Sequence, residues 1–139
     1  QPINPLKQAI SAGATFVART TSTNPNHVLQ MMEAAMDHDG FSFIECYSEC
    51  VEFYEGAFDA TNPRKGGTFA PVPTYHDVTD EDEAYKLAGV PFPGYFGIFY
   101  KISRPTKNAR EAEINQNARE KMKGLKDWQI LQKSFDRLK

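Results

Sequence analysis

The chain has 139 residues, of which 40% are hydrophobic, and a formal net charge of -2. This length suits one globular domain that buries roughly 70% of the surface its unfolded chain exposes. Because the chain has 16 basic and 18 acidic residues, nucleic acid and anionic membrane surfaces are excluded as general partners. No stretch approaches the ~20 apolar residues of a membrane span, and residues 1–12 contain no secretion signal, so we expect a cytoplasmic protein.

The start of the chain and its cysteines add two expectations. The sequence begins at Gln1 with a Pro-Ile-Asn-Pro run and no initiator methionine, which predicts a fragment or a processed chain. Its two cysteines, Cys46 and Cys50, are too few for a secreted disulfide framework. On an extended strand their Cα atoms would lie about 13 Å apart, beyond the ~7 Å limit for a bridge, so both should be free.

The first fifty residues alternate between helix and strand signals. Asn4-Pro5 and Asn24-Pro25 each join an N-cap to a first-turn proline, which predicts helices over residues 5–12 and 25–38. β-rich runs predict strands over residues 14–19 and 41–48. Strand, helix, strand in about 35 residues is a βαβ unit, so these two strands should be parallel neighbours.

Apolar spacing predicts which faces are buried. On the second helix a core-facing stripe is expected, widened by Leu29 and Met31. The stripe comprises Val28, Met32, Ala35 and Met36. On the second strand, alternation places two sets of side chains on opposite faces. These sets are Phe41, Phe43 and Tyr47, against Ile44, Cys46, Ser48 and Cys50.

Residues 51–79 predict an unusually long loop. They show no sustained period but are rich in aromatic side chains, namely Phe53, Tyr54, Phe58, Phe69 and Tyr75. Loops beyond ~15 residues are usually functional or disordered, and apolar surface of this extent is costly in water. We therefore expect the loop to pack on a partner chain or on its own subunit.

The remainder predicts one strand and three helices. Thr79 or Asp80 begins an acidic helix that runs to Leu87, followed by a strand over residues 94–102 that Pro105 ends. A polar helix follows over residues 108–123, and Gly124 separates it from a terminal helix. That last helix carries an apolar seam that must dock elsewhere. The seam is formed by Leu125, Trp128, Leu131, Phe135 and Leu138.

Few residues suggest chemistry. No zinc spacing, hydrolase elbow, dinucleotide fingerprint or P-loop is present, and His27, His38 and His76 are interpreted as surface or capping residues. Arg19 ends the first strand, where a phosphate or cofactor could meet it, although an ion pair or solvent is the favoured interpretation. Ligands of open α/β sheets collect beyond the carboxyl ends of strands, which is where Cys50 lies.

These elements carry a family resemblance. The first fifty residues are similar to the β subunits of 2-oxoacid:ferredoxin oxidoreductases, in their carboxy-terminal part, and the likeness extends to about residue 110. The similar runs are Ile3-Asn4-Pro5-Leu6, then residues 12–19, then Gly40-Phe41-Ser42-Phe43-Ile44-Glu45 with Ser48-Glu49-Cys50, and later Gly97-Ile98-Phe99-Tyr100 with Arg104-Pro105-Thr106.

The resemblance assigns the cysteines different roles. In that family the strand ends in Ser-Pro-Cys, and its cysteine is the last of four thiolates on a 4Fe-4S cluster. Cys50 matches that cysteine, whereas Cys46 matches no ligand and should be buried in the strand. Glu49 stands where the family usually has proline. The thiamine diphosphate and magnesium motif, Gly-Asp-Gly, is expected upstream of Gln1, and the similar string His38-Asp39-Gly40 is interpreted as a helix C-cap.

The resemblance also implies a fold and a function. The fold would be α/β, with a βαβ unit in a mostly parallel sheet and carboxy-terminal helices. Residues 1–50 would be half of a thiamine-diphosphate-binding domain and residues 51–139 an extension on the same core. The complete enzyme would decarboxylate a 2-oxoacid, 2-oxoglutarate before pyruvate, to acyl-coenzyme A and pass electrons through iron-sulfur clusters to ferredoxin. It would be a hetero-oligomer with an α subunit, and this piece would be inactive alone.

Two alternatives remain open from the residues alone. One is a non-catalytic α/β interaction domain in which Cys50 is only packing and the aromatic loop docks a partner. The other is a different thiamine-dependent decarboxylase, which would need no cluster. Bound iron and labile sulfide would separate them from the oxidoreductase.

Overall fold

The computed structural model describes residues 3–136 and divides the chain into two compact units, residues 1–104 and 105–139. The first unit contains α1 (Pro5–Ser11), β1 (Phe16–Thr21), α2 (Pro25–Met36), β2 (Ser42–Tyr47), two short 3-10 helices (Asp59–Thr61 and Pro63–Lys65), α3 (Glu81–Ala88) and β3 (Gly97–Lys101). The second contains α4 (Lys107–Met122) and α5 (Asp127–Asp136). Each predicted helix and strand has a counterpart, and the α/β class is confirmed.

Side-chain caps begin the helices where the sequence placed them. The carboxamide oxygen of Asn4 accepts a hydrogen bond from the backbone N–H of Lys7 at 3.0 Å, and that of Asn24 accepts one from His27 at 3.2 Å. For α3 the cap is Asp80. Each cap satisfies an N–H group that the first helical turn leaves unpaired.

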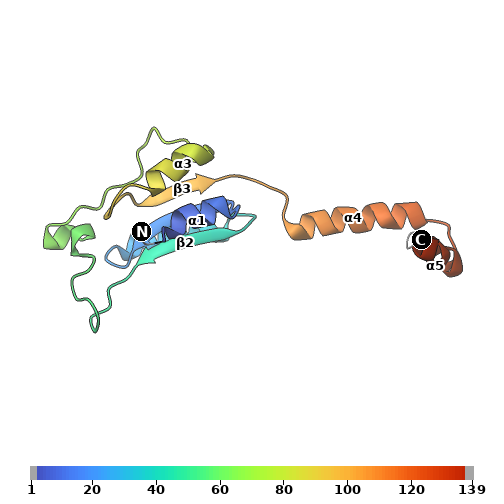
Figure 1. The fold of residues 1–139 in the computed structure, drawn as a ribbon, viewed down its shortest axis with the longest axis horizontal. Coiled ribbons are helices and arrows are strands. Elements are labelled where there is room, and N and C mark those ends of the chain that lie inside the picture. Colours follow the sequence, from blue (N-terminus) through green and yellow to red (C-terminus); the bar gives the residue numbers. More distant parts are fainter. Residues whose placement is uncertain (1–2, 137–139) are drawn as a thin grey trace. The chain divides into compact units, whose positions relative to one another are not determined.

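The sheet has three strands in the order β2-β1-β3 (Figure 1). β1 and β2 are parallel, with Phe16 opposite Ser42 and Thr21 opposite Tyr47, which confirms the predicted βαβ unit. β3 runs antiparallel to β1 on its other side. As the central strand, β1 is buried along its whole length.

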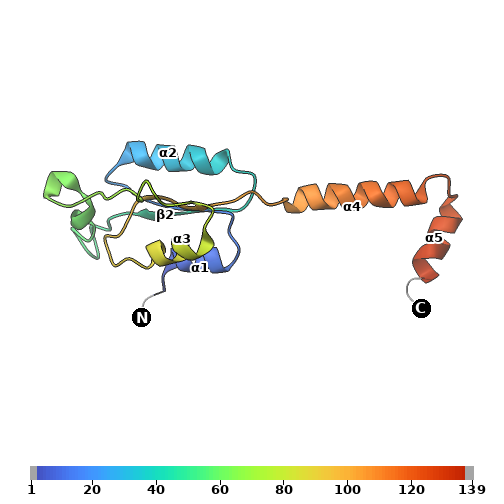
Figure 2. The same ribbon diagram turned by 90° about the horizontal axis from the view of Figure 1, so that it is seen from above.

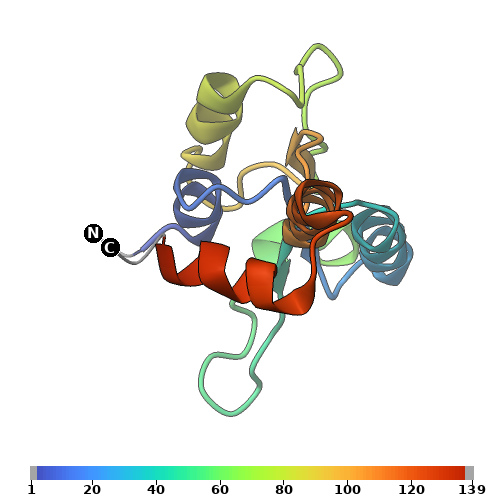
Figure 3. The same ribbon diagram turned by 90° about the vertical axis from the view of Figure 1, so that its right-hand side faces the viewer.

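Helices cover both faces of this sheet. α2 lies on one face, and α1 and α3 lie together on the other (Figures 2 and 3). The core under α1 and α3 is built around Leu6, Ile10, Val17, Phe99 and Tyr100. The core under α2 is built around Phe16, Ala18 and Met31. Because helices cover both faces of the sheet, every side chain of β1 is buried, including the polar Arg19, Thr20 and Thr21.

The predicted stripe on α2 is right for Met31 and Ala35, which face the sheet, and wrong for Met32 and Met36. Met31 is the buried methionine, and Ala34 and Ala35 pack beside it, whereas Met32 and Met36 are 53% and 85% exposed. Apolar residues occur on more than one side of this helix, so their period did not determine which side faces the sheet. The exposed side chains Leu29, Met32 and Met36 form a second apolar stripe.

The segment 51–79 packs partly on its own unit. Thr61 and His76 are buried, and Pro71 forms an isolated bridge with Phe96, so the second half of the segment adheres to the sheet. The loop directly after β2 projects away from it (Figure 3). Its exposed apolar side chains are Val51, Phe53 and Tyr54. The expectation that the loop packs on its own subunit therefore holds for its later part.

The second unit consists of α4 and α5 around Gly124, whose φ of +81° confirms the predicted break. Of the predicted apolar seam on α5, the side chains of Trp128, Leu131 and Phe135 are exposed. Leu138 lies outside the described residues. Docking of this seam stays a prediction, as does a functional boundary at residue 50. Between residues 3 and 136, no helix has both the length and the apolarity needed to cross a membrane.

Candidate functional site

A buried ion pair joins the two parallel strands toward their carboxyl ends. Arg19 Nε donates to Glu45 Oε2 at 2.7 Å, with 4% and 16% of the two side chains exposed. The pair forms because these residues are direct neighbours in the parallel register. Arg19 therefore lies within β1, which continues to Thr21, and it is ion-paired as the favoured interpretation held.

Aromatic rings surround this pair. The Arg19 guanidinium lies 5.1 Å from the ring centroid of Tyr47 and 5.5 Å from that of Phe99. Tyr47 stacks on Phe58 at 4.9 Å and meets Phe96 edge-on at 5.9 Å. Burial raises the pKa of Tyr47, an effect that Arg19 opposes and Glu45 reinforces. Phe58 of the long loop and Phe96 thus form an aromatic cover over Tyr47, at the carboxyl end of β2.

An open cleft of about 670 Å³ adjoins the ion pair. Its walls come from the start of α1, the two parallel strands and the segment after α3. The lining residues are Ile3, Asn4, Pro5, Lys7, Arg19, Glu45, Tyr47, Gly89, Val90, Pro91 and Phe92. This cleft was not predictable from the sequence, because residues from four separate segments form it.

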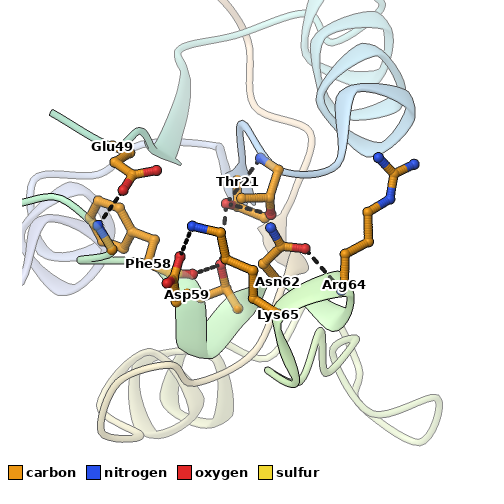
Figure 4. A network of polar contacts seen from close by, with 10 residues as sticks. Thr21, Glu49, Phe58, Asp59, Asn62, Arg64 and Lys65 are labelled. Carbon is orange, nitrogen blue, oxygen red and sulfur yellow. Dashed lines mark hydrogen bonds and ion pairs between the residues drawn. The ribbon is translucent and has the colours of Figure 1, made fainter. Parts of the chain in front are cut away.

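Cys50 lies in the projecting loop directly after β2. Its thiol is free and exposed, and its carbonyl oxygen accepts hydrogen bonds from the N–H groups of Phe53 at 3.3 Å and Tyr54 at 2.9 Å. The Glu49 carboxylate accepts a further hydrogen bond from the N–H of Gly56 (Figure 4). Glu49 thus closes the loop around Cys50 with its side chain, at the position where proline was expected.

The thiol of Cys50 suits one ligand position on an iron-sulfur cluster, because it is soft, unpaired and accessible. A cluster needs further thiolates, and within residues 3–136 no group of three or more His, Cys, Asp or Glu side chains could hold a metal ion. Cys50 as a ligand therefore stays a prediction that requires cysteines from another segment.

Cys46 is exposed, so its prediction as a buried strand residue is wrong. β2 is an edge strand, and Ile44 is the β2 residue that packs into the core under α2. Two positions further along, Cys46 lies beyond that cover. Partial desolvation still raises the pKa of its thiol.

The histidines have structural roles that differ from their predicted ones. His76 is buried, not a surface residue, and its Nε2 lies 2.6 Å from the Phe99 carbonyl oxygen while Nδ1 lies 3.4 Å from Glu83 Oε2. His27 Nδ1 lies 2.8 Å from the Thr20 hydroxyl. Burial of the surrounding loop and sheet brings these rings to polar partners that the sequence alone could not indicate.

The string His38-Asp39-Gly40 does not form the predicted helix cap, because α2 ends at Met36 with Asp37 as its C-cap. His38 Nε2 instead lies 2.9 Å from the Thr15 hydroxyl. A Cβ at Gly40 would lie 2.2 Å from the same hydroxyl oxygen, so glycine is required by close approach. The string connects α2 to the sheet.

A polar network anchors the 3-10 helices of the long loop (Figure 4). The buried hydroxyls of Thr21 and Thr61 lie 3.4 Å apart, and Thr61 also donates to the Phe58 carbonyl at 2.8 Å. On the surface Lys65 pairs with Asp59 at 2.8 Å, and this hydrogen bond raises the pKa of Lys65. The sequence did not predict this network, since its central contact joins Thr21 and Thr61, which are 40 positions apart.

Comparison with known proteins agrees with the resemblance. The chain is 37% identical over 59 residues to the 2-oxoglutarate oxidoreductase subunit KorB of Mycobacterium tuberculosis, covering 42% of this chain and 16% of that subunit. It is 42% identical over 48 residues to the 2-oxoglutarate synthase subunit KorB of Methanocaldococcus jannaschii, covering 34% and 18%. Over these stretches the chain is similar to the β subunits of 2-oxoacid:ferredoxin oxidoreductases. No protein-family model matches it.

The fold agrees with the sequence match. A solved 2-oxoglutarate:ferredoxin oxidoreductase from Magnetococcus marinus, with 2-oxoglutarate, coenzyme A and succinyl-CoA bound, superposes with a TM-score of 0.69 at 29% identity. The superposition covers 94% of this chain and 44% of that one. The chain thus spans less than half of the solved relative and about a sixth of the curated ones.

Proposed function

We propose that the chain is part of the β subunit of a 2-oxoacid:ferredoxin oxidoreductase. The reaction is the oxidative decarboxylation of a 2-oxoacid, 2-oxoglutarate in preference to pyruvate, with transfer of the acyl group to coenzyme A and of electrons to ferredoxin. The observation that carries this proposal is the superposition of 94% of the chain on an enzyme solved with 2-oxoglutarate and coenzyme A. The two relatives are named as subunits of a 2-oxoglutarate oxidoreductase and of a 2-oxoglutarate synthase, which favours an enzyme over a non-catalytic interaction domain.

The chain contributes one ligand and a subunit surface to the proposed enzyme. Thiamine diphosphate with Mg²⁺ and a 4Fe-4S cluster supply the decarboxylation and electron-transfer chemistry when bound. Cys50 is proposed as one cluster thiolate, held by the turn that its own carbonyl and the Glu49 carboxylate close. The residues that bind thiamine diphosphate are proposed to lie in another segment of the β subunit. An α subunit and ferredoxin are the proposed partners, and the cytoplasm is the proposed location.

The test of the ligand uses the two cysteines as a matched pair. Both thiols are exposed and free, so Cys46→Ala controls for loss of an accessible thiol. In the anaerobic full-length complex we expect Cys50→Ala to lose or convert one cluster, measured as iron, acid-labile sulfide and the electron paramagnetic resonance of the reduced protein. We expect Cys46→Ala to leave all three unchanged. An unchanged cluster content in Cys50→Ala would reduce Cys50 to a packing residue.

The test of the reaction is separate. The full-length complex should reduce ferredoxin in a reaction that requires coenzyme A, with a higher kcat/KM for 2-oxoglutarate than for pyruvate. Reduction of ferredoxin by neither acid would contradict the proposed activity, whatever the cluster content.

A further inference from the structure

We infer that the cleft beside Arg19 and Glu45 binds the carboxylate of an organic acid with an apolar body. This inference does not depend on the proposed function. It rests on the unpaired donors of a buried arginine, on the charge balance of the cleft and on the apolar side chains at its rim.

The first argument is the state of the Arg19 guanidinium. An arginine side chain presents five N–H donors, and within residues 3–136 the hydrogen bond to Glu45 uses Nε alone. The side chain is 96% buried and lines the cleft. A Cβ at Gly94 would lie 2.9 Å from Nη1, so glycine there allows the chain to approach the guanidinium closely. The Nη groups of Arg19 are therefore open to the cleft, where an oxyanion would accept charge-assisted hydrogen bonds from them.

The charges of the cleft select the kind of anion. Arg19, Lys7 and Glu45 are its ionisable side chains apart from Tyr47. Two cations and one carboxylate leave a single positive charge, which a monoanionic carboxylate neutralises. A phosphate dianion would instead leave excess negative charge beside the buried Glu45 carboxylate. The planar guanidinium also matches the geometry of a carboxylate.

The apolar side chains at the rim of the cleft indicate what kind of molecule bears the carboxylate. Ile3, Val90 and Phe92 line the cleft and are 77%, 37% and 49% exposed. Pro5 and Pro91 add further apolar surface. Binding sites for small molecules typically combine such apolar walls with a few converging polar groups. An acid with a short aliphatic chain would bury these side chains while its carboxylate reached Arg19.

The experiment measures binding of radiolabelled hexanoate to the full-length protein by equilibrium dialysis. Hexanamide, which has the same chain without the charge, is the control ligand, and inorganic phosphate is the competitor. We expect saturable hexanoate binding, at least tenfold weaker binding of hexanamide and no displacement by equimolar phosphate. Equal binding of hexanamide, or no saturable binding at all, would overturn the inference. Displacement of bound hexanoate by equimolar phosphate would indicate that the cleft binds a phosphoryl group, and it would overturn the carboxylate assignment.

Variants place the binding in the cleft. Lys7→Met removes a rim cation without touching the buried pair and should weaken binding about two- to fivefold. The double variant Arg19→Met, Glu45→Met removes the pair without leaving one charge unpaired and should abolish binding. Arg64→Met removes an exposed cation outside the cleft and should change nothing. If Lys7→Met and the folded double variant both bind hexanoate with wild-type affinity, the binding site is not this cleft.

Discussion

Arg19 and Glu45 occupy opposite positions on β1 and β2 and meet at 2.7 Å in an almost fully buried ion pair. Removing one partner leaves the other charge buried, so Arg19→Met should lower the free energy of unfolding by about 3 kcal/mol. The double variant Arg19→Met, Glu45→Met should be nearly as stable as the wild type. Urea denaturation of the full-length protein checks this, and equal losses in the single and double variants would contradict it.

Tyr47 stabilises the aromatic cover through its ring rather than its hydroxyl. The ring stacks on Phe58 and meets Phe96, while no hydrogen bond joins the hydroxyl to another residue between 3 and 136. We expect Tyr47→Phe to change stability by less than about 0.5 kcal/mol, and Tyr47→Ala to cost about 2–3 kcal/mol. Thermal unfolding distinguishes the two. A large loss in Tyr47→Phe would indicate that the hydroxyl has a partner of its own.

Gly67 and Gly89 should differ in their tolerance of alanine. A Cβ at Gly67 would lie 2.2 Å from the backbone oxygen of Asp59, whereas a Cβ at Gly89 would meet the flexible end of Lys7 at 2.6 Å. Backbone cannot yield cheaply, so Gly67→Ala should cost about 1–3 kcal/mol and loosen the long loop. Gly89→Ala should cost less, because Lys7 can move. The measurement is hydrogen exchange of the backbone N–H groups at positions 67 and 68, which donate to the carbonyl oxygens of Asn62 and Ala60.

His27 should make stability depend on pH. Burial lowers its pKa below the usual 6.5, so the unfolded chain binds its proton more readily than the folded one. Stability from the neutral ring is therefore complete above pH 6.5 and declines as the pH falls below it. His27→Asn should flatten that part of the curve of unfolding free energy against pH. An unchanged slope would mean that other groups cause the dependence, and His38→Asn is the matched control.

The local sequence predicted the helices and strands well because their signals are local. Asn4, Asn24 and Asp80 each cap the helix that follows within three residues. The rotation of α2 was not predictable, because Leu29 and Met32 offer a second apolar side that nothing in the sequence distinguishes from the buried one.

For the candidate site, the sequence determined the family resemblance, the β1–β2 pair and the place of Cys50 after β2. Tertiary structure alone decided that Arg19 meets Glu45, that Cys46 is exposed and that residues near positions 5 and 91 share one cleft. The physical reason is range: caps and alternation act over a few residues along the chain, whereas burial and ion pairing depend on segments that only folding brings together.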